Sequence, residues 1–501
     1  MKKILSIILS LIFVFSTALP VFAAGTVNQT CPTIYVPGFA GSGIYSDKND
    51  PSTKAASPDV NEILEAAKKD LLPTLITYIA TGNGDPFAYK LTELVNTIFA
   101  DYFNNPDGSA KGNSGTYLAY PTYVSKTSRL IFSNDWRSDP FVLASQLNDY
   151  INYICQKSGS EKVAIQCHSL GSVVVTTYLK VYGTSKISGI VFDSPALEGV
   201  TYVGELLNGN PKLAGDSLAI GIKGILGEME YNELISGAID MLELAGITDD
   251  AAGFLDELVA KTAPILYKET LVPLFACWPT IWAMTPDKYI DGAMEFIFST
   301  YCSGEEYAGL KEKVEKYNTD VRPYKKDILL DFDANGRLAV ISRYGFIGLP
   351  VTPTWNIHTD TVVDTASTSF GATIAPYGTS FSADYLEGKD MALISPDRTI
   401  DASTCLFPEK TWFIKNIAHD KTGATSSLRL ELLFGAEEAT IENSDHPRFM
   451  IYDAENEVLL EDKTEFEEPV EETKGGSIFR KVINFFTALF NFFTNLFSAK
   501  K

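Results

Sequence analysis

Histidine is scarce in this chain, which has only His168, His358, His419 and His446 among its 501 residues. The six cysteines show no paired C-x-x-C spacing, so the usual ligand pattern of a zinc site is missing. Basic residues are outnumbered, with 41 Lys and Arg against 63 Asp and Glu, and the formal net charge is −22. Nucleic acid is therefore excluded as a partner, because phosphate binding requires a clustered cationic surface.

The cysteines are even in number and spread along the chain, at Cys31, Cys155, Cys167, Cys277, Cys302 and Cys405. An even number in an exported chain permits disulfide bridges, but spacing alone does not select a pairing. A bridge between Cys277 and Cys302 is one hypothesis, because these two cysteines flank a single apolar region. Buried free thiols are the alternative, which suits Cys155 and Cys167 because both lie in apolar stretches.

The first 23 residues have the organisation of an export signal. Lys2 and Lys3 precede an almost wholly apolar run over residues 4–15, and Val21-Phe22-Ala23 offers a small-x-small cleavage site. We therefore predict a signal peptide at residues 1–23 and a secreted mature protein. An N-terminal membrane anchor is the alternative, although the apolar run is short for a membrane span.

Residues 475–501 form a segment rich in phenylalanine. Between residues 478 and 497, pairs of apolar side chains recur about every 3.5 residues, which predicts a helix with one apolar face. Polar residues occupy the other face and Lys500 and Lys501 follow, a composition typical of helices at a membrane interface. We predict attachment to a membrane or cell surface through residues 478–497. The alternative is docking on the protein itself or on another subunit.

The body of the chain, residues 24–435, alternates predicted strands with predicted helices. This pattern is typical of an α/β protein with a mostly parallel sheet and helices on both faces. Two helical insertions interrupt it at about residues 46–125 and 200–328, and the second is apolar enough to form a lid. Residues 436–474 are predicted to form a short β appendage and an acidic linker. Strands are predicted at residues 33–36, 130–132, 163–166, 187–192, 338–344 and 411–414.

The sequence Cys-His-Ser-Leu-Gly at residues 167–171 is the strongest chemical signal. It lies between a predicted strand and a predicted helix, the setting of a nucleophile elbow that presents one hydroxyl at the carboxyl edge of a sheet. Such a turn needs small residues two positions to either side; Gly171 fits, and Cys167 stands where glycine is usual. We identify Ser169 as the candidate nucleophile, and an incidental loop serine is the alternative.

A nucleophilic serine needs a base, and in enzymes with such an elbow the acid and then the histidine follow the serine along the chain. His419 meets this requirement, because it comes between the last predicted strand of the body and a helix predicted at residues 426–434. His168 is adjacent to Ser169 and is predicted to point away from the site. His446 lies too far into the appendage.

The acid of the triad is expected in the loop after the preceding strand. Asp360 is the first choice and Asp364 is the reserve, both within the loop at residues 359–364. Asp193 is a third candidate, because some hydrolases carry the acid at the end of an earlier strand. A solvated loop aspartate is the alternative for Asp360.

Acyl transfer also needs hydrogen-bond donors directed at the developing oxyanion. The backbone amide of Leu170, directly after the serine, is one candidate. The second is the amide of Phe39 in the glycine-rich loop at residues 37–42, where glycines allow the backbone to approach closely. A plain glycine-rich turn is the alternative for this loop.

With these segments assembled, the chain resembles the α/β-hydrolase superfamily and, within it, the lipases related to lecithin:cholesterol acyltransferase. The family has tyrosine where this chain has Asn134, and its acid loop carries two glycines that this chain lacks. The resemblance implies an α/β-hydrolase fold and an esterase or acyltransferase activity. It rests on residues 32–38 (Pro-Thr-Ile-Tyr-Val-Pro-Gly) with Gly41 and Ser42, residues 134–137 (Asn-Asp-Trp-Arg), residues 168–171 (His-Ser-Leu-Gly) and the aspartate loop at residues 359–363.

We therefore predict a secreted serine hydrolase that cleaves, or transfers, acyl groups of lipid-type carboxylic esters. The partner is expected to be a lipid or another acyl-ester substrate held beneath the apolar lid. The chemistry requires neither a cofactor nor a metal. Two alternatives stay open: a non-catalytic surface- or membrane-binding protein on a hydrolase scaffold, and an esterase acting on polyester or cell-wall esters.

Overall fold

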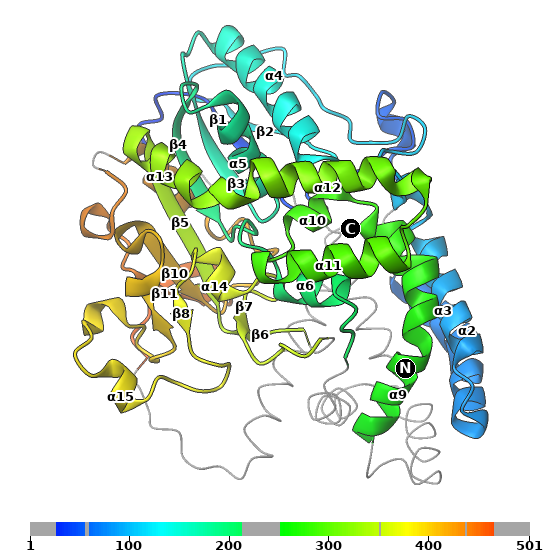
Figure 1. Ribbon diagram of the computed structural model, residues 1–501. Coiled ribbons are helices and arrows are strands. Elements are labelled where there is room, and N and C mark those ends of the chain that lie inside the picture. The colour runs from blue at the N-terminus through cyan, green and yellow to red at the C-terminus, as the bar shows by residue number, and fades with distance from the viewer. Residues whose placement is uncertain (1–26, 56–59, 213–250, 350–351, 436–437, 465–501) are drawn as a thin grey trace.

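The computed structural model describes residues 27–55, 60–212, 251–349, 352–435 and 438–464 (Figure 1). The predicted signal peptide and the predicted phenylalanine-rich helix lie outside the described residues, as do residues 465–474 of the predicted linker. Within the described residues, no helix is both long enough and apolar enough to cross a bilayer.

An eight-stranded sheet forms the centre of the molecule, in the spatial order β12-β11-β10-β5-β4-β3-β1-β2. Neighbouring strands are parallel except for β11 and β12. This arrangement confirms the predicted mostly parallel sheet. The strands are β1 (Thr33–Val36), β2 (Arg129–Ile131), β3 (Val163–His168), β4 (Ile187–Asp193), β5 (Arg337–Tyr344), β10 (Thr411–Lys415), β11 (Phe449–Asp453) and β12 (Val458–Glu461).

Both faces of the sheet are buried, as expected for parallel strands joined by helices. Along β5, Val340 faces one hydrophobic core and Ile341 faces the other, because successive side chains of a strand point to opposite faces. Helices α4 (Pro140–Ser158) and α5 (Gly171–Tyr182) pack in the core that contains Val340. Helix α16 (Ser426–Phe434) packs in the core that contains Ile341.

The C-terminal hairpin continues the central sheet instead of forming a separate appendage. β11 pairs in parallel with β10, and β12 returns antiparallel to β11. Met450 of β11 belongs to the same buried cluster as Trp412 of β10. Phe449 stacks on Phe413, with ring centroids 5.6 Å apart. These apolar contacts extend the core past the boundary expected before residues 436–474.

The first insertion is helical, as predicted. Helix α2 (Val60–Thr81) packs against α3 (Asp85–Ile98), and α3 packs against α9 (Ala251–Leu266) of the second insertion, so the three form the helical arm seen in Figure 1. Helix α2 contains Pro73 and continues through it. Packing against α3 compensates for the hydrogen bond that proline cannot donate.

The second insertion is also helical over its described residues. Helix α6 packs against α11, and α10 packs against α12 and α4, so the insertion is attached to the body of the molecule at several points. Its elements, besides α9, are α6 (Thr201–Leu207), the π-helical η4 (Tyr267–Ala276), α10 (Pro279–Ala283), α11 (Asp287–Thr300), α12 (Ala308–Asp320) and α13 (Lys325–Asn335).

The segment between β5 and β10 contains more secondary structure than the sequence indicated. Two-residue strands carry too little hydrophobic periodicity to be recognised from sequence. The elements are the antiparallel pair β6 (Phe346–Ile347) and β7 (His358–Thr359), the antiparallel pair β8 (Thr373–Ile374) and β9 (Ile400–Asp401), and the short helices α14 (Thr365–Thr368) and α15 (Ala383–Leu386).

All six cysteines are buried free thiols in the structure. The bridge considered between Cys277 and Cys302 is not formed. Burial raises the pKa of both thiols to about 12, which keeps them protonated and unreactive in this state.

Candidate active site

Ser169 lies at a sharp turn between β3 and α5, which confirms the predicted strand–turn–helix setting. Its φ angle is +53°, in the left-handed region that residues other than glycine rarely adopt. The Ser169 carbonyl accepts hydrogen bonds from the amide of Ser172 at 3.0 Å and from its hydroxyl at 2.6 Å. These bonds hold the turn, which places the Ser169 side chain beside the N-terminus of α5.

Two glycines allow the elbow to pack closely against β1 and the loop after it. A Cβ atom at Gly171 would lie 2.2 Å from the carbonyl oxygen of Val36, and one at Gly38 would lie 2.5 Å from the Cβ of Ser169. Neither position can take a side chain unless the backbone moves. Cys167, which stands in place of the usual glycine, is fully buried, and its thiol donates to the Val191 carbonyl at 3.6 Å.

His419 and Asp360 form a buried hydrogen-bonded pair. The His419 Nδ1 lies 2.6 Å from Asp360 Oδ2, and the His419 backbone amide donates to the Asp360 carbonyl at 2.7 Å. Because a carboxylate can only accept, Nδ1 carries the proton and Nε2 is the basic nitrogen. This is the geometry required of a general base and the acid that orients it.

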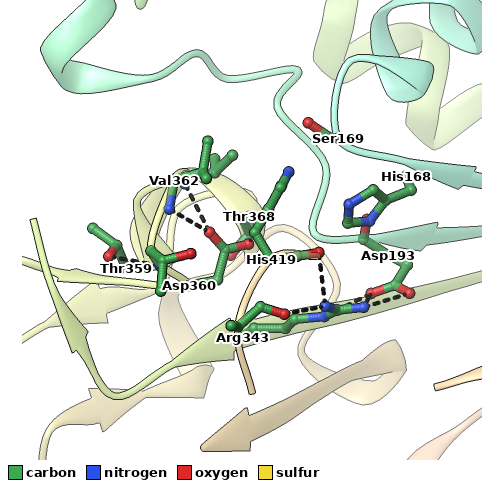
Figure 2. A network of polar contacts seen from close by, with 12 residues as sticks. His168, Ser169, Asp193, Arg343, Thr359, Asp360, Val362, Thr368 and His419 are labelled. Atoms are coloured by element: carbon green, nitrogen blue, oxygen red, sulfur yellow. Dashed lines mark hydrogen bonds and ion pairs between the residues drawn. The ribbon is translucent and has the colours of Figure 1, made fainter. Parts of the chain in front are cut away.

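A tight turn fixes the Asp360 carboxylate (Figure 2). Its Oδ1 accepts hydrogen bonds from the amides of Val362 and Val363, at 3.0 and 2.7 Å. Burial by itself raises the pKa of Asp360, but His419 and the Val363 amide outweigh burial and hold that pKa below its ordinary value. Thr361 has a φ angle of +90°, a conformation that glycine adopts most easily, so this turn forms without a glycine at that position.

Ser169 and His419 face a common space without a hydrogen bond between them. In Figure 2 the ring nitrogen of His419 that is remote from Asp360 points to the side on which the Ser169 hydroxyl lies. Among the described residues, neither Ser169 Oγ nor His419 Nε2 has a hydrogen-bond partner, so both are available to a substrate. Catalytic hydrogen bonds are often long before the substrate binds.

His168 packs against His419, contrary to the expectation that it points away from the site. The two ring centroids are 4.4 Å apart, and His168 Nδ1 lies 2.9 Å from the Asp193 carbonyl, to which it donates. Burial, followed by the neighbouring His419, lowers the pKa of His168 well below its ordinary value, so the ring is neutral. Neighbouring side chains point to opposite faces only within a strand, and Ser169 lies beyond the end of β3. His168 and Ser169 can therefore both reach the site.

Asp193, the third candidate for the acid, has a different role. Its carboxylate accepts hydrogen bonds from Arg343 at 2.8 to 3.0 Å, from Thr425 Oγ1 at 2.6 Å, and from Arg429. Burial opposes its charge, but the two guanidinium groups outweigh burial and hold the pKa of Asp193 far below its ordinary value. Its oxygens are therefore occupied by a fully buried ion network, and His419 pairs with Asp360 instead.

Asp364, the reserve candidate, also lies away from the base. Its Oδ2 accepts a hydrogen bond at 2.8 Å from the amide of Thr201, the first residue of α6. Burial raises the pKa of Asp364 to about 6. Asp364 therefore ties the acid loop to the beginning of the second insertion.

The two predicted oxyanion donors belong to the segments that contact Ser169. Leu170 follows Ser169 directly, and Phe39 belongs to the loop whose glycine lies against the serine. The ring of Phe39 packs on Trp136 with centroids 4.5 Å apart, and the Trp136 indole donates to a carbonyl of the same loop at 3.0 Å. The Asn-Asp-Trp-Arg segment at residues 134–137 thus supports the loop that carries Phe39.

Ser169 opens into an apolar pocket that contains about 770 Å³ of space between protein atoms, open solvent included. Most of its wall comes from α6, η4, α10 and α11 of the second insertion. None of the lining residues carries a charge. They are Phe39, Ser169, Val200, Tyr202, Val203, Leu206, Leu207, Tyr267, Leu271, Phe275, Ile281, Met284, Ile297, Val362 and Val363.

Sequence reasoning did not single out the arginines beneath the site. Arg343 lies on β5 and Arg429 on α16, and both are fully buried. The sequence does contain a signal for this ion pair, because Arg343 interrupts one apolar strand and Asp193 ends another. Two opposite charges at the ends of buried strands predict a buried ion pair.

The parallel sheet, the serine elbow on β3 and the order Ser169, Asp360, His419 define an α/β-hydrolase fold. A family model described as alpha/beta hydrolase fold matches residues 108–215, which include β2, β3, Ser169 and β4. Over these residues the chain is similar to the α/β-hydrolase family, and the sheet topology of the described residues agrees with that fold.

Two solved structures are similar to the chain at low identity. The crystal structure of the Tle4–Tli4 complex is 10% identical; the match covers 81% of this chain and 97% of that one, with a TM-score of 0.33. The crystal structure of the lin2722 gene products from Listeria innocua is also 10% identical, covering 85% and 99% of the two chains, with a TM-score of 0.26. A search of curated proteins found no match.

Proposed function

We propose that this protein is a secreted serine hydrolase that cleaves lipid-type carboxylic esters through Ser169, His419 and Asp360. One observation carries the proposal: Ser169, at the elbow, opens into a wholly uncharged pocket, and the His419–Asp360 pair lies beside that elbow. A nucleophile, an oriented base and an apolar binding space are the parts that ester hydrolysis of a lipid requires.

The first half of the reaction forms an acyl-enzyme. Ser169 Oγ attacks the ester carbonyl carbon while His419 Nε2 takes the hydroxyl proton, and Asp360 stabilises the resulting imidazolium through the 2.6 Å bond to Nδ1. The backbone amides of Leu170 and Phe39 bind the oxyanion in this proposal. Each such donor is worth about 3 kcal/mol in the transition state.

The alcohol then departs with the proton held by His419 as its bond to the acyl carbon breaks, and this completes the acyl-enzyme. In the second half, His419 Nε2 takes a proton from a water molecule that attacks the acyl carbon, and it returns that proton to Ser169 Oγ as the acid leaves. An alcohol in place of water would give acyl transfer, because the acyl-enzyme is common to both reactions.

The pocket favours an uncharged, apolar acyl group. The side chains that α6 and η4 contribute to its wall offer no partner for a charged group. An acyl chain therefore loses its contact with water on binding, and each buried methylene stabilises the complex by about 0.8 kcal/mol. This term predicts a preference for longer chains until the pocket is full.

Hydrolysis of p-nitrophenyl esters of increasing acyl length tests the proposal. We expect turnover that rises from acetate towards medium and long chains and is abolished in Ser169→Ala, with the circular dichroism spectrum unchanged. Turnover that persists in Ser169→Ala would refute the assignment.

Two other outcomes would point elsewhere. If all esters are inert while the protein binds lipid vesicles equally well with and without Ser169→Ala, the non-catalytic surface-binding alternative is favoured. If short esters alone are cleaved and polyester or cell-wall ester substrates are preferred, the triad stands but the lipid assignment does not. Deleting residues 478–497 tests the proposed membrane or cell-surface attachment, since vesicle binding should then be lost.

A further inference from the structure

We propose that Arg343 is a positioning residue that holds the base His419 in register with the nucleophile Ser169. The proposal rests on the proposed function, because it names the group that aligns two members of the triad. Arg343 itself touches neither the pocket nor Ser169 in the described contacts.

The Arg343 guanidinium binds directly to the loop that carries the base. Its Nη1 donates to the carbonyl of Ala418 at 2.8 Å and to the carbonyl of His419 at 3.2 Å. The His419 amide on the other side of the same residue donates to the Asp360 carbonyl. The backbone of His419 is therefore held between the acid loop and Arg343 (Figure 2).

The same guanidinium is anchored to the strand end beside the nucleophile. Its Nε and Nη2 form a bidentate pair with the Asp193 carboxylate, at 2.8 to 3.0 Å. The backbone carbonyl of Asp193 in turn accepts hydrogen bonds from the Ser169 amide at 3.3 Å and from His168 Nδ1 at 2.9 Å. Asp193 thus links the elbow to Arg343, and Arg343 links Asp193 to His419.

Arg343 also receives a contact from the acid side of the triad. Thr365, in the first turn of α14, donates from its hydroxyl to the Arg343 carbonyl at 3.0 Å. One residue at the end of β5 therefore contacts the segments that carry His419 and Asp360 directly, and it is linked through Asp193 to the segment that carries Ser169. Since Arg343 is fully buried, these bonds are not exchanged with water.

Only an arginine can make this set of bonds. A planar guanidinium directs donors in fixed, diverging directions, so it can serve a carboxylate and two carbonyls at once. A lysine at the same place keeps the positive charge for Asp193 but is a compact donor without the fork. It would therefore leave the carbonyls of residues 418–419 without their partner.

Arg429 provides a matched control. It is also fully buried and also pairs with Asp193, but its other hydrogen bonds go to Gln166 at 3.0 Å and Thr425 at 2.6 Å, and its guanidinium lies 5.5 Å from the centre of the Tyr35 ring. It makes no contact with residues 418–419 among the described interactions. Arg429→Lys therefore disturbs the ion network to a similar extent without releasing His419.

The test compares Arg343→Lys with Arg429→Lys in the full chain, using the best p-nitrophenyl ester and the folded fraction measured by circular dichroism. We expect kcat to fall about 10²-fold in Arg343→Lys, the usual effect of misplacing a catalytic group by about 1 Å, with KM within twofold of the parent value. In Arg429→Lys we expect kcat within threefold of the parent. Equal losses of kcat in the two variants, or a loss confined to KM, would overturn the proposal.

A second variant pair keeps the comparison possible if Arg343→Lys does not fold. Asp193→Asn/Arg343→Gln and Asp193→Asn/Arg429→Gln each remove one acid and one base, so they leave the same charge behind. We expect kcat to fall further in Asp193→Asn/Arg343→Gln than in Asp193→Asn/Arg429→Gln. Equal falls in kcat would contradict the proposal.

An activity-independent readout separates this proposal from the proposed function. The His419 Nδ1 proton, which is hydrogen-bonded to Asp360, should give a low-field NMR signal. We expect this signal to be equally sharp in the parent and in Arg429→Lys, and to be broadened or lost in Arg343→Lys. If the parent protein cleaves no ester, the proposed function fails while this comparison still reports on positioning. If the parent is active and the signal is unchanged in Arg343→Lys, only the positioning role fails.

Discussion

The imidazole of His168 lies against the imidazole of His419, with ring centroids 4.4 Å apart and an interplanar angle of 42°. The residue next to the candidate nucleophile is thus in contact with the candidate base. Because His168 is neutral, it adds no charge to oppose the positive charge that His419 gains while it holds the serine proton. A charged His168 at this distance would disfavour that state.

The neutrality of His168 is the first testable consequence. Burial and the nearby His419 lower the pKa of His168 well below its ordinary value, so its ring should not gain a proton between pH 6 and pH 8. Imidazole nitrogen shifts in a ¹⁵N-labelled sample measure this directly, with His168→Gln identifying the signals. A His168 signal that moves across this pH range contradicts the assignment.

Replacing Asp360 by Asn should lower kcat by about 10³- to 10⁴-fold. An amide in place of the carboxylate can present its NH₂ group to His419 Nδ1 and so favour the wrong tautomer of the base. Asp364→Asn is the matched control in the same loop and should keep kcat within about threefold, because Asp364 binds Thr201 and not His419. Steady-state kinetics on one ester suffice. If the two variants lose activity in the reverse order, the acid is Asp364.

Adding a methyl group at Gly171 should strongly destabilise the fold. The Cβ of Gly171→Ala would lie 2.2 Å from the Val36 carbonyl oxygen, so β1 and the elbow would have to separate. Overpacking of this kind costs about 1–3 kcal/mol, and both activity and the urea midpoint should fall. Gly423→Ala is the control, since nothing lies within 4 Å of a Cβ there. Parent-like stability in Gly171→Ala would show that the elbow is looser than described.

Asp364 should make the stability of the protein depend on pH in a defined direction. Its pKa of about 6 is above the ordinary value of 3.8, so the fold favours the protonated acid. The stabilisation of the fold by the protonated Asp364 is fully present below about pH 4 and is lost as the pH rises through 6. Between pH 4 and pH 7, the free energy of unfolding of Asp364→Asn should therefore rise relative to the parent by an amount on the order of 3 kcal/mol.

Urea unfolding of the two proteins at a series of pH values measures this difference. The comparison cancels the titration of groups common to both proteins. A difference that is flat from pH 4 to pH 7, or that falls with pH, would show that the Asp364 carboxyl is already ionised in the folded state at low pH.

The parts of the site that sequence predicts are those set by local structure. A strand, a small residue, a serine and a helix start are contiguous, so the Ser169 elbow is visible in a window of about ten residues. His419 is predicted from its place after the last strand of the body, and Asp360 from its loop. The structure pairs the two residues, but the β6–β7 pair beside Asp360 was not predicted.

The parts that sequence does not predict depend on contacts between distant segments. His168 meets His419 across 251 positions of the chain, and Arg343 meets Asp193 across 150. No periodicity encodes such pairs. The place of the C-terminal hairpin was missed for the same reason, because its pairing with β10 is decided by buried apolar contacts and not by the pattern within the hairpin.

The wall of the pocket and the triad come from different parts of the chain. The helices of the second insertion supply most of the surface that a substrate would touch, whereas Ser169, Asp360 and His419 are held by the sheet and its connecting loops. If the proposed function holds, substitutions along α6 or η4 will change which ester is preferred while the candidate triad keeps its place. Exchanging this helical module would therefore change the surface offered to a ligand, while the segments that hold Ser169, Asp360 and His419 would stay as they are.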